Sequence, residues 1–258
     1  MKVVILAGGF GTRISEESVF RPKPMIEIGD KPILWHIMKN FSAQGYNEFI
    51  ICCGYKQHMI KEWFANYYLY NSDVTFDFEH QNQITIHQNL VDPWKVTLVD
   101  TGLYTMTGGR IKRIQPYIGE ETFLFTYGDG ISTVPIDKLV EYHRSHKKIA
   151  TLTGAKIEQK FGVLDMGEDG QVRSFREKSQ LDGSLINSGY MVLEPEIFSY
   201  IQGDETFFEK EPLETLAQED QLRVFVHEGF WKCMDTQRDR EQLEELWNSN
   251  HAPWKIWK

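Results

Sequence analysis

The first thirteen residues constrain the fold more than any other part of the chain. The segment 2–7 contains four consecutive apolar residues, the pattern of a parallel strand that is buried on both faces. A glycine-rich turn, Leu6 to Arg13, follows at the carboxyl end of this strand. In open α/β sheets ligands bind at that edge, and glycines let backbone N–H groups approach phosphate oxygens closely. Arg13 and Lys23 add two cations beside the turn, so we predict a ligand that carries several phosphates.

Two common phosphate-binding motifs do not fit this turn. The dinucleotide pattern GxGxxG, started at Gly9, requires a glycine where the chain has Ile14. The P-loop pattern, started at Gly8, requires Gly-Lys where the chain has Arg13 and Ile14. An isolated Gly-Gly-x-Gly also occurs in strand-to-helix connections for steric reasons only. The adjoining Thr-Arg pair and Lys23 favour a third kind of phosphate-binding loop.

Composition indicates a folded globular protein and limits its partners. The 258 residues suffice for one domain with an elaborated flank. The 37 acidic side chains outnumber the 28 basic ones and give a net charge of -9, so we expect neither a nucleic-acid nor a membrane partner. The first strand leaves no room for a signal peptide, and no apolar run has the length of a membrane span. The three cysteines form no disulfide or zinc pattern, so we expect a cytoplasmic protein with reduced cysteines.

Apolar residues with strand and helix periodicity alternate along much of the chain. The alternation predicts an α/β fold, a Rossmann-like and mostly parallel sheet flanked by helices, in a single domain spanning residues 1–258. A β-rich insertion at about 70–107 and a smaller β-rich part at about 156–234 interrupt the alternation. Thr236 and Asp239 form a capping-box pair at the start of the final helix.

Two aspartates are candidates for a metal site opposite the glycine turn. Asp129 follows the strand that ends at Tyr127, and Asp235 lies between a strand and the closing helix. Each also has an ordinary structural interpretation, as a tight Asp-Gly turn and as a helix cap, respectively. Together with Arg13 and Lys23 they predict a magnesium-phosphate site, because Mg²⁺ takes one or two carboxylates plus phosphate oxygens.

A second group of polar residues is a candidate for binding a sugar phosphate. Glu177 and Lys178 stand side by side at a strand end, which suits a sugar hydroxyl and its phosphate; a solvated charge pair is the alternative interpretation. Asn187 could hydrogen-bond a polyol, and Gly189 allows close approach. The eight histidines show no metal-ligand spacing such as HExxH.

These elements in this order resemble the sugar-1-phosphate nucleotidylyltransferases. The family signature LxGGxGTR followed by KPM is present as Leu6 to Arg13 and Lys23 to Met25, and the match covers the whole chain. The resemblance is closest to members that join CTP and α-D-glucose 1-phosphate to give CDP-glucose and pyrophosphate, the entry to CDP-linked deoxysugars of bacterial surface polysaccharides such as O-antigen. The segments that carry this closer resemblance are 31–36, 49–55, 96–102, 107–110, 123–130 and 252–255.

The resemblance implies a role for each matching residue. Catalytic residues would be Lys23, Arg13, Asp129 and Asp235, with Mg²⁺ held by Asp129 and Asp235. The nucleotide would contact Leu6, Ala7, Gly8, Gly9, Phe10, Gly11, Thr12, Arg13, Lys23, Thr105, Arg110 and Gly128. The sugar phosphate would contact Glu177, Lys178 and Asn187, in the β-rich part at about 156–234.

The sequence indicates the oligomeric state less directly than it indicates the phosphate-binding site. Trp247, Trp254 and Trp257 place more aromatic surface after the last helix than a free tail should expose. Either this tail packs back on its own domain or it meets another subunit. The tail and the β-rich insertion suggest a sizeable interface between copies, and the resemblance points to a homohexamer.

Two alternative functions remain open from the residues. A uridylyl- or thymidylyltransferase would differ mainly in the base pocket, which physical reasoning on this sequence does not resolve. A catalytically silent sugar-nucleotide sensor is the second alternative. The presence of Lys23, Asp129 and Asp235 argues against a sensor, because a sensor needs neither the metal carboxylates nor the lysine.

Overall fold

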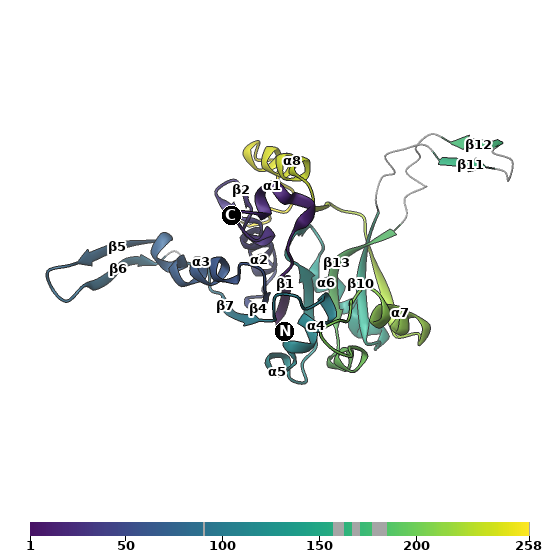
Figure 1. Ribbon diagram of the computed structural model, residues 1–258, viewed down its shortest axis with the longest axis horizontal. Helices are drawn as coiled ribbons and strands as arrows, with labels where there is room; N and C mark the ends of the chain where they lie inside the picture. Colours follow the sequence, from purple (N-terminus) through teal and green to yellow (C-terminus); the bar gives the residue numbers. More distant parts are fainter. Residues whose placement is uncertain (90, 157–162, 167–170, 177–184, 258) are drawn as a thin grey trace.

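A seven-stranded sheet forms the centre of the molecule. The structure, a computed structural model, describes residues 1–89, 91–156, 163–166, 171–176 and 185–257. The strand order is β14-β10-β13-β8-β1-β4-β7 (Figure 1), and every strand except β13 runs in the same direction. The mostly parallel sheet is therefore confirmed. Its strands are β1 (Val3–Ala7), β4 (Glu48–Cys53), β7 (Lys95–Asp100), β8 (Phe123–Tyr127), β10 (Ala150–Lys156), β13 (Leu185–Leu193) and β14 (Leu222–His227).

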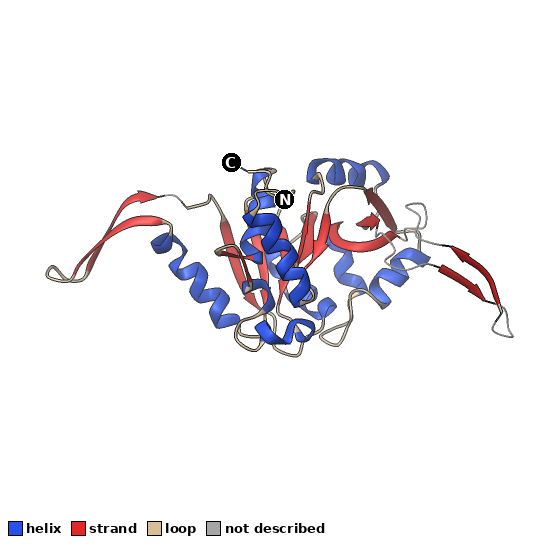
Figure 2. Cartoon of the chain, turned by 90° about the horizontal axis from the view of Figure 1, so that it is seen from above, coloured by secondary structure: helices blue, strands red, loops and turns tan. Residues whose placement is uncertain are grey.

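Helices cover both faces of this sheet (Figure 2). Successive side chains of a buried strand point to opposite faces. In β1, Val3 and Ile5 therefore pack with α2, α6 and α8, whereas Val4 and Leu6 pack in a second apolar cluster with α4 and α7. The helices are α1 (Ser15–Ser18), α2 (Ile33–Ala43), α3 (Gln57–Tyr70), α4 (Thr107–Arg113), α5 (Gln115–Ile118), α6 (Ile136–His146), α7 (Glu211–Gln218) and α8 (Gln237–Asn248), with short 3₁₀ turns η1 (Thr12–Ile14), η2 (Lys23–Met25) and η4 (Pro195–Tyr200).

Among the described residues, four two-stranded ribbons accompany the main sheet. The hairpin β5–β6 extends well beyond α3 and away from the body of the molecule (Figures 1 and 2). The ribbon of β9 and β15 joins residues about a hundred positions apart, next to the carboxyl edge of the sheet. The ribbons are β2 (Glu27–Ile28) with β3 (Lys31–Pro32), β5 (Ser72–Asp77) with β6 (Gln83–Asn89), β9 (Gly130–Ser132) with β15 (Trp231–Cys233), and β11 (Val163–Met166) with β12 (Val172–Arg176).

The expected β-rich insertion is narrower than its predicted range. Lys95–Asp100 pairs in parallel with β4, so it belongs to the central sheet as its edge strand β7. The alternating pattern that suggested an insertion reflects an edge strand that is only partly buried. The remaining strands of the predicted range, β5 and β6, form a separate hairpin.

The tryptophan-rich tail packs back on its own chain. Trp254 is fully buried, and its indole Nε1 donates a hydrogen bond to Nδ1 of His36 (3.4 Å). Since Nδ1 accepts, Nε2 of His36 carries the proton that it donates to the carbonyl oxygen of Ile28 (2.9 Å). Trp247, which we expected after the last helix, lies within α8 and packs edge-on against the same imidazole, with ring centroids 4.6 Å apart. The tail therefore closes the core over α2.

No helix in the described ranges combines the length and the apolar character that a membrane span requires.

Candidate active site

The glycine loop lies where the strand order of the sheet reverses. Strand β1 pairs with β4 on one side and with β8 on the other. The connections that follow β1 and β8 therefore lead to opposite halves of the sheet, and the loop after β1 lies in the crevice between them. Gly11 adopts a left-handed backbone conformation (φ 67°) that few other residues tolerate. At Gly8 a Cβ would lie 2.1 Å from a guanidinium nitrogen of Arg110. These two positions require glycine for different reasons, one conformational and one steric.

Arg110 supports the loop from beneath. Its guanidinium is buried and donates hydrogen bonds to carbonyl oxygens of Cys53 (3.3 Å), Gly102 (2.7 Å) and Leu103 (3.2 Å). A further bond reaches Oγ1 of Thr101 (2.8 Å). Arg110 thus ties the ends of β4 and β7 together directly behind the backbone of the glycine loop and places a positive charge there.

The ribbon of β9 and β15 brings the two candidate aspartates together. Cys233 lies opposite Gly130 in the antiparallel register, and the next residue, Met234, donates its N–H to the carbonyl oxygen of Asp129 (2.9 Å). Asp129 and Asp235 therefore flank the end of one ribbon although they are far apart in sequence. Their side chains are 22% and 26% exposed, so both carboxylates are accessible from the cleft but sheltered from bulk water.

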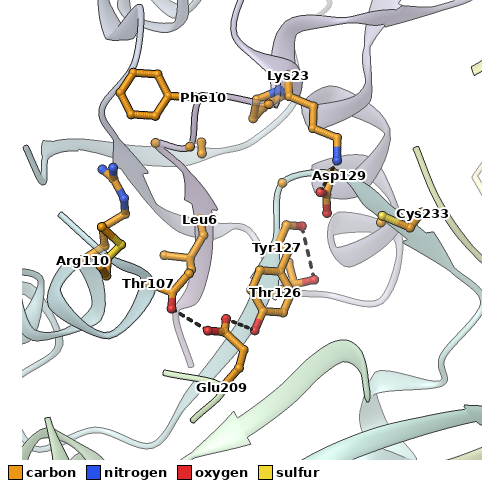
Figure 3. Close-up of a pocket in the computed structure, with 18 of the residues that line it drawn as sticks. Leu6, Phe10, Lys23, Thr107, Arg110, Thr126, Tyr127, Asp129, Glu209 and Cys233 are labelled. Carbon is orange, nitrogen blue, oxygen red and sulfur yellow. Dashed lines mark hydrogen bonds and ion pairs between the residues drawn. The ribbon is translucent and has the colours of Figure 1, made fainter. Parts of the chain in front are cut away.

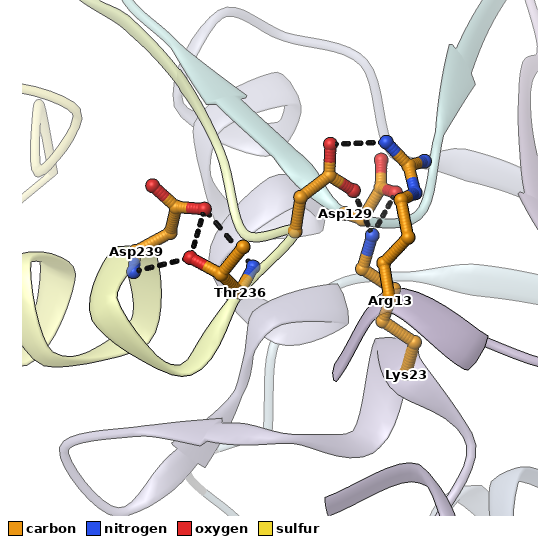
Figure 4. Close-up of polar contacts among 6 residues, drawn as sticks. Arg13, Lys23, Asp129, Thr236 and Asp239 are labelled. Atoms are coloured by element: carbon orange, nitrogen blue, oxygen red, sulfur yellow. Dashed lines mark hydrogen bonds and ion pairs between the residues drawn. The ribbon is translucent and has the colours of Figure 1, made fainter. Parts of the chain in front are cut away.

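Lys23 contacts the carboxylates of both aspartates, and Arg13 contacts that of Asp235 (Figure 4). The ammonium group of Lys23 donates to Oδ2 of Asp129 and to Oδ1 of Asp235, each at 2.6 Å. Nη1 of Arg13 donates to the other oxygen of Asp235 at 2.5 Å. Burial opposes the charge on Lys23, but Asp129 and the hydrogen bonds to both aspartates outweigh this and raise its pKa. Lys23 is therefore a fully charged, oriented cation at neutral pH.

The residues at this point fit a divalent cation. Ligand atoms of Asp129, Cys233 and Asp235 lie within 4.8 Å of one another. The two carboxylates are the hard oxygen ligands that Mg²⁺ prefers, and substrate phosphates normally complete its shell. Burial raises the pKa of the Cys233 thiol, so this third group stays protonated and is a poor ligand for a hard cation.

A cleft of about 920 Å³ runs from the glycine loop to these carboxylates (Figure 3), within the range of volumes common for small-molecule sites. Its far wall is a hydrogen-bonded group in which Glu209 accepts from the hydroxyls of Tyr127 (2.5 Å) and Thr107 (2.6 Å). Burial and the nearby Glu209 carboxylate raise the pKa of Tyr127, which therefore stays a hydrogen-bond donor. Polar groups that can bind hydroxyls thus face the phosphate end of the cleft.

The structure brings nearly all predicted site residues to this single cleft. Asn187 lines this cleft. Its Oδ1 accepts the N–H of Gly189 (2.9 Å), which fixes the orientation of the side-chain amide. Glu177 and Lys178 lie outside the described residues. The predicted residues that line the cleft are Leu6, Ala7, Gly8, Gly9, Phe10, Gly11, Thr12, Arg13, Lys23, Thr105, Arg110, Gly128, Asp129, Asn187 and Asp235.

Several lining residues were missed by sequence reasoning. Trp231 and Cys233 line the cleft together with Asp235, at every second position of one extended segment. A period of two through this segment could have identified them, because alternate side chains of a strand share a face. Glu209 also lines the cleft but gave no such signal, since it lies in an irregular segment before α7 and its hydrogen-bond partners, Tyr127 and Thr107, come from other elements.

Comparison with known proteins assigns this fold and cleft to a class. The sequence matches the family described as Nucleotidyl transferase over residues 2–239, so the chain belongs to that family. Within the family it is 54% identical to the glucose-1-phosphate cytidylyltransferase of Salmonella typhi over 259 residues, covering 100% of both chains. It is also 43% identical to the probable glucose-1-phosphate cytidylyltransferase of Bacillus subtilis over 258 residues, again covering 100% of both.

Solved structures show the same architecture. HddC from Yersinia pseudotuberculosis complexed with GMP-PN is 26% identical, with a TM-score of 0.67, over 95% of this chain and 99% of that one. A UDP-glucose pyrophosphorylase complexed with UDP-glucose has a TM-score of 0.67 at 17% identity, over 96% of this chain and 98% of the other, which supports the fold alone.

Proposed function

We propose that this protein transfers the cytidylyl group of CTP to α-D-glucose 1-phosphate, giving CDP-glucose and pyrophosphate. The observation that carries the proposal is the convergence of the glycine loop, Lys23 and the carboxylates of Asp129 and Asp235 at one end of a single cleft. The choice of CTP and glucose 1-phosphate rests on the full-length similarity to relatives named glucose-1-phosphate cytidylyltransferase.

The reaction is a displacement at phosphorus. A phosphate oxygen of the sugar phosphate forms a bond to the α-phosphorus of CTP, the bond to the oxygen that bridges the α- and β-phosphates breaks, and pyrophosphate leaves with the electron pair. The second pKa of a phosphate monoester is about 6, so the nucleophile is largely a dianion at neutral pH and needs no general base. The protein therefore contributes position and charge rather than proton transfer.

The chain's cations hold the nucleotide in this proposal. The backbone of Gly8 to Arg13 would bind the β- and γ-phosphates, as glycine-rich turns at strand ends do. Lys23 would place its ammonium beside the reacting phosphates and stabilise the charge that develops there. Thr105 and Arg110 line the nucleotide side of the cleft, with Arg110 supporting the loop.

Asp129 and Asp235 would hold Mg²⁺ in this proposal. When bound, Mg²⁺ neutralises phosphate charge and orients the reacting oxygens. Asn187 would bind the sugar, together with Glu177 and Lys178 by resemblance, in the β-rich part at about 156–234.

Pyrophosphate release tests the proposal directly. The purified protein is incubated with CTP, UTP or dTTP, each with and without glucose 1-phosphate, and with Mg²⁺. We expect release with CTP and glucose 1-phosphate together, and background release in every other mixture. Faster release with UTP or dTTP would overturn the base assignment. Nucleotide binding without release would favour the sensor function, and an Asp235→Ala preparation controls for contaminating enzymes.

Assembly from several copies, a homohexamer by resemblance, is part of this proposal. Cross-strand neighbours Val74 and Ile86, and Phe76 and Ile84, give the projecting hairpin β5–β6 an apolar face. Phe76 and Phe78 are 48% and 79% exposed, and a lone two-stranded ribbon is only marginally stable in water. Another copy of the chain that covers this face would remove its apolar side chains from water and stabilise the ribbon.

The proposed compartment is the cytoplasm. Cys52, Cys53 and Cys233 are all free thiols, which suits a reducing environment. We propose that CDP-glucose made there feeds the synthesis of CDP-linked sugars for a surface polysaccharide such as O-antigen.

A further inference from the structure

The carboxylates of the proposed metal site already have cationic partners within the chain. Lys23 donates to one oxygen of Asp129 and one of Asp235 at 2.6 Å each, and Arg13 donates to the remaining oxygen of Asp235 at 2.5 Å. Three of the four carboxylate oxygens are thus engaged by positive groups. Two positive charges balance two negative ones, so the cluster carries no net charge to attract a further cation.

The two cations differ in how firmly they are held. The side chain of Lys23 is 9% exposed and bridges both aspartates, whereas that of Arg13 is 70% exposed and touches one. Ionic interactions are stronger in a sheltered site than at an exposed one, where water screens them. The Lys23 ammonium is therefore the main obstacle to a second cation, and Arg13 a minor one.

We propose that Lys23 is a resident cation that competes with the divalent metal for Asp129 and Asp235. The metal would bind poorly to the protein alone and well only together with a triphosphate, whose oxygens offer Lys23 and Arg13 new partners. The flexible four-carbon stem of lysine permits this exchange. The inference rests on the proposed function, because it takes Asp129 and Asp235 as the metal ligands.

The binding of Mn²⁺ alone tests this competition. Mn²⁺ serves as a probe for Mg²⁺, and electron paramagnetic resonance measures the free ion in titrations of the full chain without nucleotide or sugar phosphate. We expect Lys23→Met, which keeps the length of the side chain and removes its charge, to bind Mn²⁺ about tenfold to a hundredfold more tightly than the wild type. Arg13→Met should give a smaller gain, because Arg13 is exposed and contacts one carboxylate.

Two controls keep the test decisive. Lys61→Met removes an exposed lysine on α3 and should bind Mn²⁺ as the wild type does. If Lys23→Met fails to fold, Lys23→Gln replaces it. The increase in melting temperature on adding Mn²⁺ gives a second readout, since at a given concentration a ligand that binds more tightly stabilises the folded state more. Equal or weaker Mn²⁺ binding by the folded Lys23 variants would overturn the proposal.

Failure of this inference and failure of the proposed function are distinguishable. The titration contains neither substrate, so its outcome does not depend on which nucleotide the protein uses. A wild type that makes CDP-glucose but gains no Mn²⁺ affinity on loss of Lys23 would refute the competition alone. Tighter Mn²⁺ binding by the variants of a protein that makes no CDP-glucose would refute the proposed function alone.

Discussion

At the scale of single residues, turnover should depend on the charges that meet at the end of the cleft. Lys23→Ala and Asp235→Ala should each lower the rate of pyrophosphate release by about a hundredfold to ten-thousandfold, because each removes a preorganised charge at the reacting phosphates. Steady-state kinetics with CTP and glucose 1-phosphate measure the loss. Lys61→Ala, which removes an exposed lysine on α3, should retain the wild-type rate. Near-normal turnover in either site variant would remove the role assigned to that residue.

His36 should make the protein sensitive to mild acid. Burial lowers its pKa from 6.5 to about 4, and protonated Nδ1 would face the N–H of Trp254. Between pH 6.5 and about 4 the unfolded chain binds a proton that the folded protein does not. The free energy of unfolding therefore decreases as the pH is lowered through this window, and it levels off below about pH 4. The total contribution is about 3 kcal/mol.

Urea unfolding at about pH 8 and about pH 5 measures this effect. His36→Gln should be less stable than the wild type at the higher pH, because the amide fills the indole-lined site less well, but it should lose less stability on acidification. An equal loss in both proteins would assign the acid sensitivity to other groups, among them His146 and His227, whose pKa values burial also lowers.

The sequence predicted these residues unevenly, for physical reasons. Lys23, Asp129 and Asp235 were identifiable only in combination, because carboxylates at strand ends and cations beside a glycine turn together suit a metal and phosphates, although each aspartate alone also has an ordinary structural use. Their direct contact could not be inferred, since it depends on the register of β9 against β15. Glu209 was missed because its partners, Tyr127 and Thr107, come from other elements.

At the scale of elements, the start of α8 is a test of local stabilisation beside the site. Oγ1 of Thr236 accepts the N–H of Asp239 (3.2 Å), and Oδ2 of Asp239 accepts the N–H of Thr236 (2.9 Å), as the sequence predicted. Thr236→Ala should lower the free energy of unfolding by about 1 kcal/mol, because it leaves a helix N–H without its partner. Thr236→Ser keeps the hydroxyl and should retain most of the stability.

Turnover should respond less than stability to the same substitution. Asp235 adjoins Met234, whose N–H is bonded to Asp129, so the ribbon of β9 and β15 positions the carboxylate from the side opposite the helix. We expect Thr236→Ala to change the rate of pyrophosphate release less than about tenfold. A larger loss with a normal urea midpoint would mean that the helix cap itself positions Asp235.

Elements were predictable where one periodicity dominated. The buried strands β1, β4 and β8 and the amphipathic helices α2, α3 and α6 follow from apolar spacing alone. The edge strand β7 was wrongly assigned to the β-rich insertion, because an edge strand that is exposed on one side has the same alternating pattern as a strand of a separate hairpin. The helix α7 and the ribbon strands β9 and β15 are short, and their pairing depends on distant segments, so local pattern did not reveal them.

At the scale of the whole molecule, the hairpin β5–β6 should determine assembly. It projects from the body of the molecule (Figure 2). Its apolar face, formed by Val74, Phe76, Ile84 and Ile86 with Phe78 nearby, packs against no core cluster of the described part of the chain. The tryptophan tail is a weaker candidate for an interface than the sequence suggested, because Trp254 is buried within its own chain. The hairpin is thus the stronger candidate for contacts between copies.

Replacing the two exposed phenylalanines tests this assignment. Phe76→Ser with Phe78→Ser removes the ring pair whose centroids lie 6.2 Å apart, and should shift the protein to a smaller assembly, because apolar burial drives association. Size-exclusion chromatography with light scattering at micromolar concentration measures the mass. Tyr117→Ser, at a residue on α5 that is 47% exposed, is the matched control and should leave the mass unchanged. A monomeric wild type, or a double variant with the wild-type mass, would show that this face of the hairpin does not hold the copies together. A lower mass with an unchanged melting temperature of the subunit would show that the face serves assembly and not folding, as expected of a ribbon that packs against neither core cluster of the described residues.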